Sequence, residues 1–256
     1  MAAADCQPLH SAMFPIRDDN PTLRTPVVTW GLILANLAVW VLVEGMGSGQ
    51  ALGRAVCEFG LIPGELLQRI PAGTQLPIGE GMACVILPEP TWYAPLTSMF
   101  LHGGWLHLLG NMWFLHVFGN NVEDVMGRGR FLAFYLLCGL AAAFMQVAQS
   151  PDSIIPMVGA SGAIGGIMGA YVALYPRARV HTFVFLFFLE LPAFVMLGYW
   201  FLLQLAGSAA APSQGGGVAF WAHVGGFVAG LVLSRLFRDP ELLAVHRQMT
   251  RLHFRG

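Results

Sequence analysis

Long apolar stretches alternate with short polar segments along most of the chain. Six stretches approach or exceed the roughly 18 residues that a helix needs to cross a bilayer. They predict membrane-spanning helices at about residues 27–46, 104–121, 131–149, 159–176, 189–207 and 218–236. Glu190 and Pro192 interrupt the fifth run, so Val180 to Phe188 lies either at the membrane interface or in a seventh span.

The arginines favour six spans over seven. Every basic residue is an arginine, and with six helices only Arg54 and Arg69 fall on one side of the membrane while all the others fall on the opposite side. Basic residues concentrate in cytoplasmic loops. We therefore expect an all-α polytopic membrane protein, a six-helix bundle with both termini in the cytoplasm.

This topology divides the chain into three parts. A cytoplasmic N-terminal segment (1–26) precedes a six-helix domain (27–237), and a cytoplasmic tail (238–256) follows as a short amphipathic helix. A long outer loop, about 47–103, lies within the domain and is rich in Gly and Pro. Pro63 is suited to the first turn of a short helix in this loop.

The outer loop also holds Cys57 and Cys84. In an oxidising compartment the two could form a disulfide. The alternative is a pair of free, partly buried thiols.

Composition agrees with a membrane protein. Hydrophobic residues make up 56% of the 256 positions and charged residues 11%, which is far from the balance of soluble domains. The net charge of −1 says little about partners. The expected surroundings are the lipid bilayer, and no nucleic-acid partner is expected.

Two polar residues stand near the starts of apolar helices that run inward from the outer face. Ser161 lies among small residues in the run Gly159 to Gly166, and His223 lies near the start of the last apolar stretch. Small residues allow close helix packing, which would bring the serine to the histidine. A serine hydroxyl is a poor nucleophile until a base takes its proton, and a buried neutral histidine suits that task. The alternative is that Ser161 and His223 only form structural hydrogen bonds.

His107 and Asn111 are four residues apart and share one helix face. Their N–H groups could stabilise an oxyanion, or they could only join helices. A zinc site with His102, His107 and His223 is disfavoured, because no carboxylate or cysteine completes a ligand set. No metal is expected.

We expect no acidic group beside His223. Glu44 and Glu190 are placed near the cytoplasmic side, away from the histidine. The chemistry predicted is therefore that of a Ser–His dyad.

These motifs resemble those of the rhomboid family of intramembrane serine proteases. The matches are Gly159-Ala160-Ser161-Gly162, His107-x-x-x-Asn111 preceded by His102, and Ala222-His223-x-x-Gly226-x-x-x-Gly230. The resemblance implies that Ser161 is the nucleophile and His223 the base. His107, Asn111 and the Ser161 backbone N–H would form the oxyanion hole, with supporting roles for His102, Gly159, Gly162 and Gly226.

The resemblance also implies partners and location. The substrates would be transmembrane segments of other membrane proteins, cut near their outer end without a cofactor, in a bacterial inner membrane. The alternative is an inactive rhomboid-like protein that binds membrane clients, although such members typically lack the serine or the histidine. The oligomeric state is not predicted.

The chain departs from the family pattern in two places. Tyr93-Ala94 stands where many members have Trp-Arg, so the outer loop needs another anchor. Gly165 stands where many members have an aromatic residue that packs on the catalytic histidine. Another group must therefore hold His223 in orientation.

Overall fold

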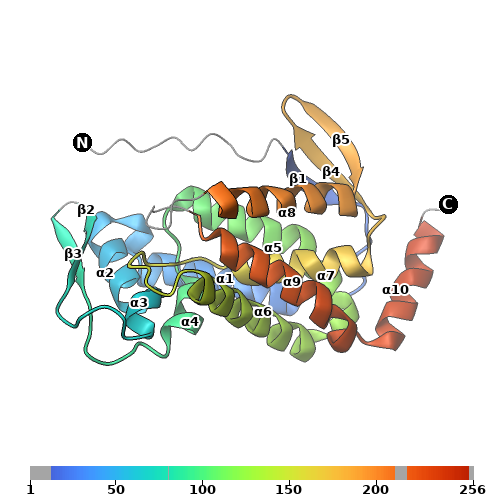
Figure 1. Cartoon of the computed structure of the whole chain (residues 1–256). Coiled ribbons are helices and arrows are strands. Elements are labelled where there is room, and N and C mark those ends of the chain that lie inside the picture. The colour runs from blue at the N-terminus through green and yellow to red at the C-terminus, as the bar shows by residue number, and fades with distance from the viewer. Residues whose placement is uncertain (1–12, 80, 211–217, 254–256) are drawn as a thin grey trace.

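The computed structural model describes residues 13–79, 81–210 and 218–253, and its centre is a bundle of helices (Figure 1). Six helices form the bundle: α1 (Val27–Leu42), α5 (Trp105–Met126), α6 (Arg128–Gln149), α7 (Ser161–Leu174), α8 (Ala193–Ala210) and α9 (Phe220–Phe237). By length and composition α6, α8 and α9 can each cross a membrane, whereas α1 and α7 are shorter apolar helices. The molecule is mostly helical and suited to a bilayer.

The shorter α7 lies at the centre of the bundle. Eleven of its 14 residues are buried. It packs on α9 backbone to backbone, because a Cβ at Gly226 would overlap the Gly162 carbonyl and one at Gly230 would overlap that of Gly166. Glycine is what allows two membrane helices to approach this closely. The α7–α9 pair is thus the most tightly joined part of the fold.

The connection between α1 and α5 forms a small layer of its own at one end of the bundle (Figure 1). It contains α2 (Gly49–Phe59), α3 (Pro63–Leu66), β2 (Gln75–Gly79), β3 (Met82–Val85) and α4 (Ala94–Thr97), with single 3-10 turns at Gly45–Gly47 and Ser98–Phe100. Helix α1 ends at Leu42 instead of near residue 46, since Gly45, Met46 and Gly47 all have positive φ.

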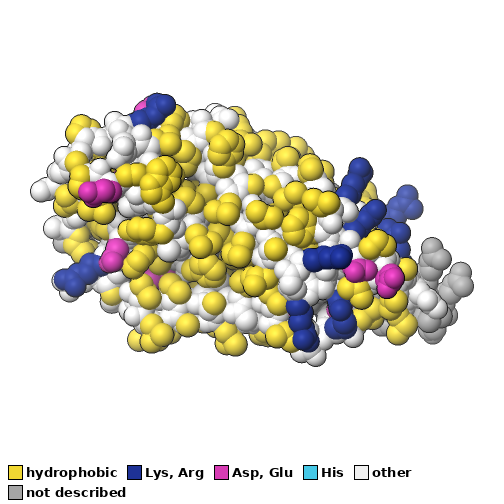
Figure 2. Space-filling view, turned by 90° about the horizontal axis from the view of Figure 1, so that it is seen from below, with side chains coloured by type: hydrophobic (Ala, Val, Ile, Leu, Met, Phe, Trp, Pro, Cys, Tyr) yellow, Lys and Arg dark blue, Asp and Glu magenta, His cyan; other side chains and the backbone are white. Residues whose placement is uncertain are grey.

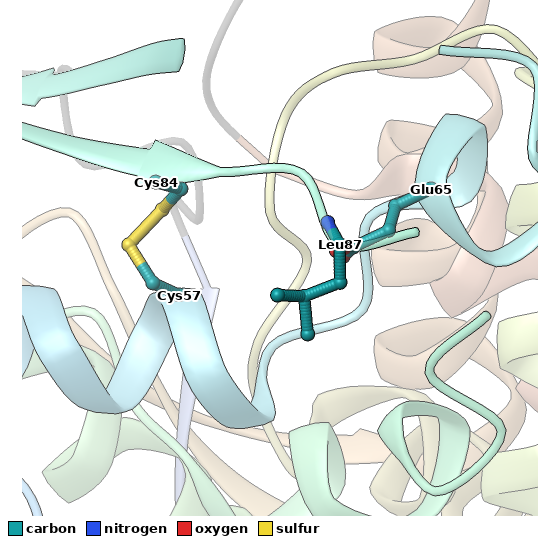
Figure 3. The surroundings of a disulfide bond; sticks show 4 residues. All are labelled: Cys57, Glu65, Cys84 and Leu87. Carbon is teal, nitrogen blue, oxygen red and sulfur yellow. A yellow bond between two sulfur atoms is a disulfide. The ribbon is translucent and has the colours of Figure 1, made fainter. Parts of the chain in front are cut away.

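A disulfide between Cys57 and Cys84 joins α2 to β3 in this layer (Figure 3). Nearby, the Glu65 carboxylate accepts the Leu87 backbone N–H at 2.9 Å. The Thr97 hydroxyl donates to the Phe59 carbonyl at 2.8 Å. These contacts join the helices and strands of the layer to one another.

Strands correct the expectation of a purely helical chain. Besides the β2–β3 hairpin, β1 (Met13–Asp18), β4 (Arg179–Val184) and β5 (Phe187–Pro192) form an antiparallel sheet in the order β1-β4-β5. The prediction that a helix begins at residue 189 is wrong, because α8 begins at Ala193. The run from 180 to 191 holds four Phe, two Val and one Thr, residues that favour strands, and Pro192 is tolerated at the end of an edge strand.

The sheet places two distant segments at one end of the bundle. β1 precedes α1, whereas β4 and β5 connect α7 to α8, and the two meet at the end opposite the loop layer (Figure 1). The α5–α6 junction lies at this end too, since Arg24 pairs with Asp124 at 3.7 Å and the Asp239 N–H donates to the Val125 carbonyl at 2.7 Å.

Apolar and basic side chains lie in separate regions of the surface. Figure 2 shows an apolar band over the bundle and basic side chains gathered mainly at the end where the chain terminates. There the tail forms α10 (Pro240–His253). At the β4–β5 turn, Phe185, Leu186 and Phe187 are exposed, and their interfacial location stays a prediction.

Candidate active site

Ser161 is the first residue of α7 and follows a backbone conformation that glycine favours. Gly159 has φ +130°, and a Cβ there would lie 2.8 Å from the Nε2 and Cε1 atoms of His107 and 3.5 Å from the Ser161 Oγ. Gly159 is therefore required twice, for its conformation and for the space that the His107 ring occupies. The glycine brings the ring of His107 beside the hydroxyl of Ser161.

His223 meets Ser161 from the first turn of α9. The His223 Nε2 lies 2.7 Å from the Ser161 Oγ. The close approach of α7 and α9 at Gly162 and Gly226 makes this contact possible. At this distance the imidazole can accept the proton of the hydroxyl.

The other side of His223 is held by α8. The His223 Nδ1 lies 2.7 Å from the Gln204 Oε1, and the Trp200 ring lies against the imidazole with the two centroids 5.7 Å apart. A Cβ at Gly165 would come within 3.8 Å of the Trp200 ring. An aromatic residue of α8 thus packs on the imidazole beside Gly165.

Sequence reasoning missed Gln204 and Trp200. A buried amide within an apolar membrane helix is a functional candidate by default, and the spacing of four from Trp200 puts both side chains on one face. These two signals could have identified the pair. The partner of Gln204, 19 positions along the chain, could not have been read from any local spacing.

His107 and Asn111 differ in how far they are prepared for an oxyanion. The His107 Nδ1 accepts the Gly103 N–H at 3.2 Å, which leaves its Nε2 to carry the proton beside Gly159. The Asn111 amide instead donates to the His107 backbone carbonyl at 2.9 Å. It would have to exchange that intrahelical bond before it could serve a ligand.

Backbone donors are also available at the start of α7. The first N–H groups of a helix have no intrahelical partner, and the first backbone bond of this helix is from the Ile164 N–H to the Ala160 carbonyl. The N–H groups of Ser161 and Gly162 therefore face the site with the positive end of the helix dipole. Negative charge that develops beside Ser161 is stabilised there.

His102 and Glu44 form a buried layer behind His107. The His102 and His107 rings are 5.2 Å apart, edge to face. The His102 backbone N–H donates to the Glu44 Oε1 at 2.7 Å, and both side chains are fully buried. Glu44 therefore lies at the end of the bundle that holds the candidate site, which corrects the expectation that it lies far from His223's end of the molecule. Glu44 contacts the backbone of His102 and not His223.

A cavity of about 790 Å³ leads to these side chains. Its lining includes His107, Asn111, Ser161 and His223, together with the segment before α7. The volume suits an extended peptide. Among the described residues, no group of three or more His, Cys, Asp or Glu side chains could hold a metal ion.

Comparisons with known proteins point to one family. The model of the rhomboid domain matches residues 89–240. The chain is 40% identical to the rhomboid protease GluP of Bacillus subtilis over 94 residues, which cover 36% of this chain and 18% of that protein. It is 36% identical to the chloroplastic rhomboid-like protein 11 of Arabidopsis thaliana over 83 residues, covering 32% of this chain and 29% of that one.

A third relative is matched over a longer stretch. Identity to the mitochondrial rhomboid protein 1 of Saccharomyces cerevisiae is 30% over 142 residues, which cover 53% of this chain and 39% of that protein. The chain thus spans less than half the length of each of these relatives.

Proposed function

The chain belongs to the rhomboid family, and we propose that it is an intramembrane serine endopeptidase that cleaves transmembrane segments of other membrane proteins near their outer end. The observation that carries this proposal is the 2.7 Å contact between the Ser161 Oγ and the His223 Nε2 at a cavity large enough for a peptide. Serine and base need this contact for acyl transfer.

The proposed topology has six spans, α1 and α5 to α9, in a domain of residues 27–237, with the segments 1–26 and 238–256 in the cytoplasm. Pairing of β1 with β4 supports an even number of spans between them. The arginines gathered at the same end support a cytoplasmic location of that end. The membrane we propose is a bacterial inner membrane, although relatives include mitochondrial and chloroplastic proteins.

The reaction begins with attack by Ser161. As the Oγ bonds to the carbonyl carbon of the scissile peptide, its proton passes to the His223 Nε2. The carbonyl oxygen becomes an oxyanion, which the His107 Nε2–H and the backbone N–H groups at the start of α7 stabilise. Each such donor lowers the barrier by about 3 kcal/mol. Asn111 adds a further donor once it turns away from the His107 carbonyl.

The acyl-enzyme then forms and hydrolyses. The C–N bond breaks, and His223 gives its proton to the leaving amine. A water molecule from the outer side replaces the amine, loses a proton to His223 and attacks the ester carbonyl. Collapse of this second intermediate breaks the bond to Ser161, which regains its proton from His223. The sequence of steps needs no cofactor.

A reconstituted cleavage assay tests the proposal. Wild-type protein and a single-span substrate with a small residue near the outer end of its helix are placed in proteoliposomes, and the product is sized by mass spectrometry. Wild type should cleave, whereas Ser161→Ala and His223→Ala should not. Ser234→Ala is the matched control, because this buried serine of α9 bonds only the Leu231 carbonyl. Substrate that co-purifies with wild type but stays uncut would favour the alternative, a client-binding rhomboid-like protein.

A further inference from the structure

Gln204 is the one residue with a side-chain amide or a charge in α8. The side chain is 8% exposed. An amide in an apolar helix is costly to bury unless its hydrogen bonds are made. Both the amide nitrogen and the amide oxygen of Gln204 have hydrogen-bond partners, which offset the cost of burial.

The direction of the amide follows from its second partner. The Gln204 Nε2 donates to the Trp200 backbone carbonyl at 3.3 Å. A carbonyl can only accept, so the opposite orientation would place two acceptors together. The Gln204 Oε1 is thereby turned toward the His223 Nδ1, 2.7 Å away.

An acceptor at this position decides which nitrogen of His223 carries the proton. A neutral imidazole has one N–H and one lone pair. With the N–H on Nδ1 facing Gln204, the lone pair lies on Nε2, which is 2.7 Å from the Ser161 Oγ. That is the form a general base needs, and an imidazole held in the other tautomer cannot take the serine proton.

We propose that Gln204 is a positioning residue that holds His223 in the Nδ1–H tautomer, so that Ser161, His223 and Gln204 act as a neutral triad. This inference rests on the proposed function, because it deepens the role of His223 as the base. It makes α8 part of the machinery: the helix supplies both the acceptor and, through Trp200, the ring that packs on the imidazole.

Nitrogen-15 NMR of histidine-labelled wild type in detergent micelles tests the tautomer directly. The His223 signals are assigned by their loss in His223→Ala. The proposal expects a protonated Nδ1 and an unprotonated Nε2 near neutral pH. A His223 signal of the opposite tautomer would overturn it without need of any Gln204 variant.

Two variants and a control test the consequence for catalysis. Gln204→Met keeps the length of the side chain and removes the acceptor, so it should lower kcat about tenfold with KM unchanged, and the Nδ1–H tautomer should lose its dominance. Gln204→Glu keeps an acceptor oxygen and should retain that tautomer. Leu202→Ala, an exposed position of α8, should match wild type. A Gln204→Met protein that keeps the wild-type tautomer and kcat would contradict the proposal.

The failure of this inference can be told apart from failure of the proposed function. Labelling of Ser161 by a fluorophosphonate probe reports whether His223 activates the serine, and it needs no transmembrane substrate. A labelled wild type, together with a Gln204→Met protein that is labelled at the same rate and keeps the Nδ1–H tautomer, would overturn the role of Gln204 and leave the proposed protease. A folded wild type that shows the expected tautomer but is not labelled would contradict the proposed protease and leave the role of Gln204 in setting the tautomer.

Discussion

Two helices hold the proposed catalytic groups in place, and they are packed very differently. In α7, which carries Ser161, eleven of 14 residues are buried, and glycine contacts join it to α9. In α8, which carries Gln204 and Trp200, four of 18 are buried. The nucleophile and base thus stand on a rigid pair of helices, whereas the groups that orient the base stand on a helix with little of its surface held by protein.

This difference suggests a division of labour. Tight backbone packing fixes the 2.7 Å distance from Ser161 to His223, since backbone contacts cannot adjust without moving a whole helix. The orientation of the imidazole depends instead on side chains of α8. Substitutions in α8 should therefore lower activity while they change the stability of the fold little.

The largest effect is expected from a methyl group in the α7–α9 contact. In Gly226→Ala the new Cβ would overlap the Gly162 carbonyl, so we expect a loss of about 3 kcal/mol or more in stability and no activity. Thermal unfolding in detergent and the cleavage assay measure both.

The matched control is Gly198→Ala in α8, where an added Cβ meets nothing within 4 Å. It should be neutral or stabilise by up to about 1 kcal/mol, because alanine favours a helix over glycine. An equal loss of stability and activity in Gly226→Ala and Gly198→Ala would contradict the proposed difference in packing between α7 and α8.

Loss of the disulfide should lower stability without altering the site. Cys57 and Cys84 are 27 positions apart in the chain, and a disulfide that closes a loop of this length stabilises the fold by about 3 kcal/mol. The double variant Cys57→Ser, Cys84→Ser should unfold at a lower temperature and be cut sooner by protease in the connection between α1 and α5. Its kcat, measured well below the unfolding temperature, should stay within about twofold of wild type; a larger fall would show that stability and activity are coupled through this layer.

A smaller effect on stability and a larger one on activity are expected from Trp200→Ala. The substitution removes the ring that packs on His223, and we expect kcat to fall about tenfold, the equivalent of about 1.4 kcal/mol. The unfolding temperature should change much less than in Gly226→Ala. Phe194→Ala, at an exposed position of α8, serves as the control, and a similar loss of kcat there would mean that α8 acts only as a whole.

A dependence of stability on pH is expected at the end of α7 that contacts β1. Burial raises the pKa of Asp18 from 3.8 to about 7, and the Tyr171 hydroxyl donates to its carboxylate. Because the folded protein holds this proton more tightly than the unfolded chain, the contribution is fully present below about pH 4 and is lost as pH rises through 7. The unfolding temperature should therefore decrease between pH 5 and pH 8.

The variant Asp18→Asn should flatten part of that decrease, whereas Asp152→Asn at an exposed site in another part of the chain should not. An unchanged pH profile in Asp18→Asn would show that burial of Asp18 does not affect stability.

The sequence was most informative where function depends on backbone proximity. Ser161, His223 and their glycines lie in short motifs, and hydropathy places them near the starts of neighbouring helices. Proximity of the two side chains follows from those facts. The hydrogen bond from the Asn111 amide to the His107 carbonyl does not follow from them, because it depends on the rotamer of Asn111.

Elsewhere the sequence was misleading or silent. Hydropathy alone cannot distinguish a strand from a helix in a short apolar run, which is why β4 and β5 were missed. Glu44 was misplaced because its location depends on the path of the chain after α1, which brings it to the backbone of His102. Gln204 was overlooked because its meaning depends on a partner in another helix.

The most direct test of the central claim is fluorophosphonate labelling of the purified protein, followed by mass spectrometry of the labelled peptide. We expect a single adduct on Ser161 that is absent from His223→Ala, with Ser234→Ala labelled as wild type. A folded wild-type protein that takes up no probe, or carries it on another residue, would contradict the claim that His223 activates Ser161.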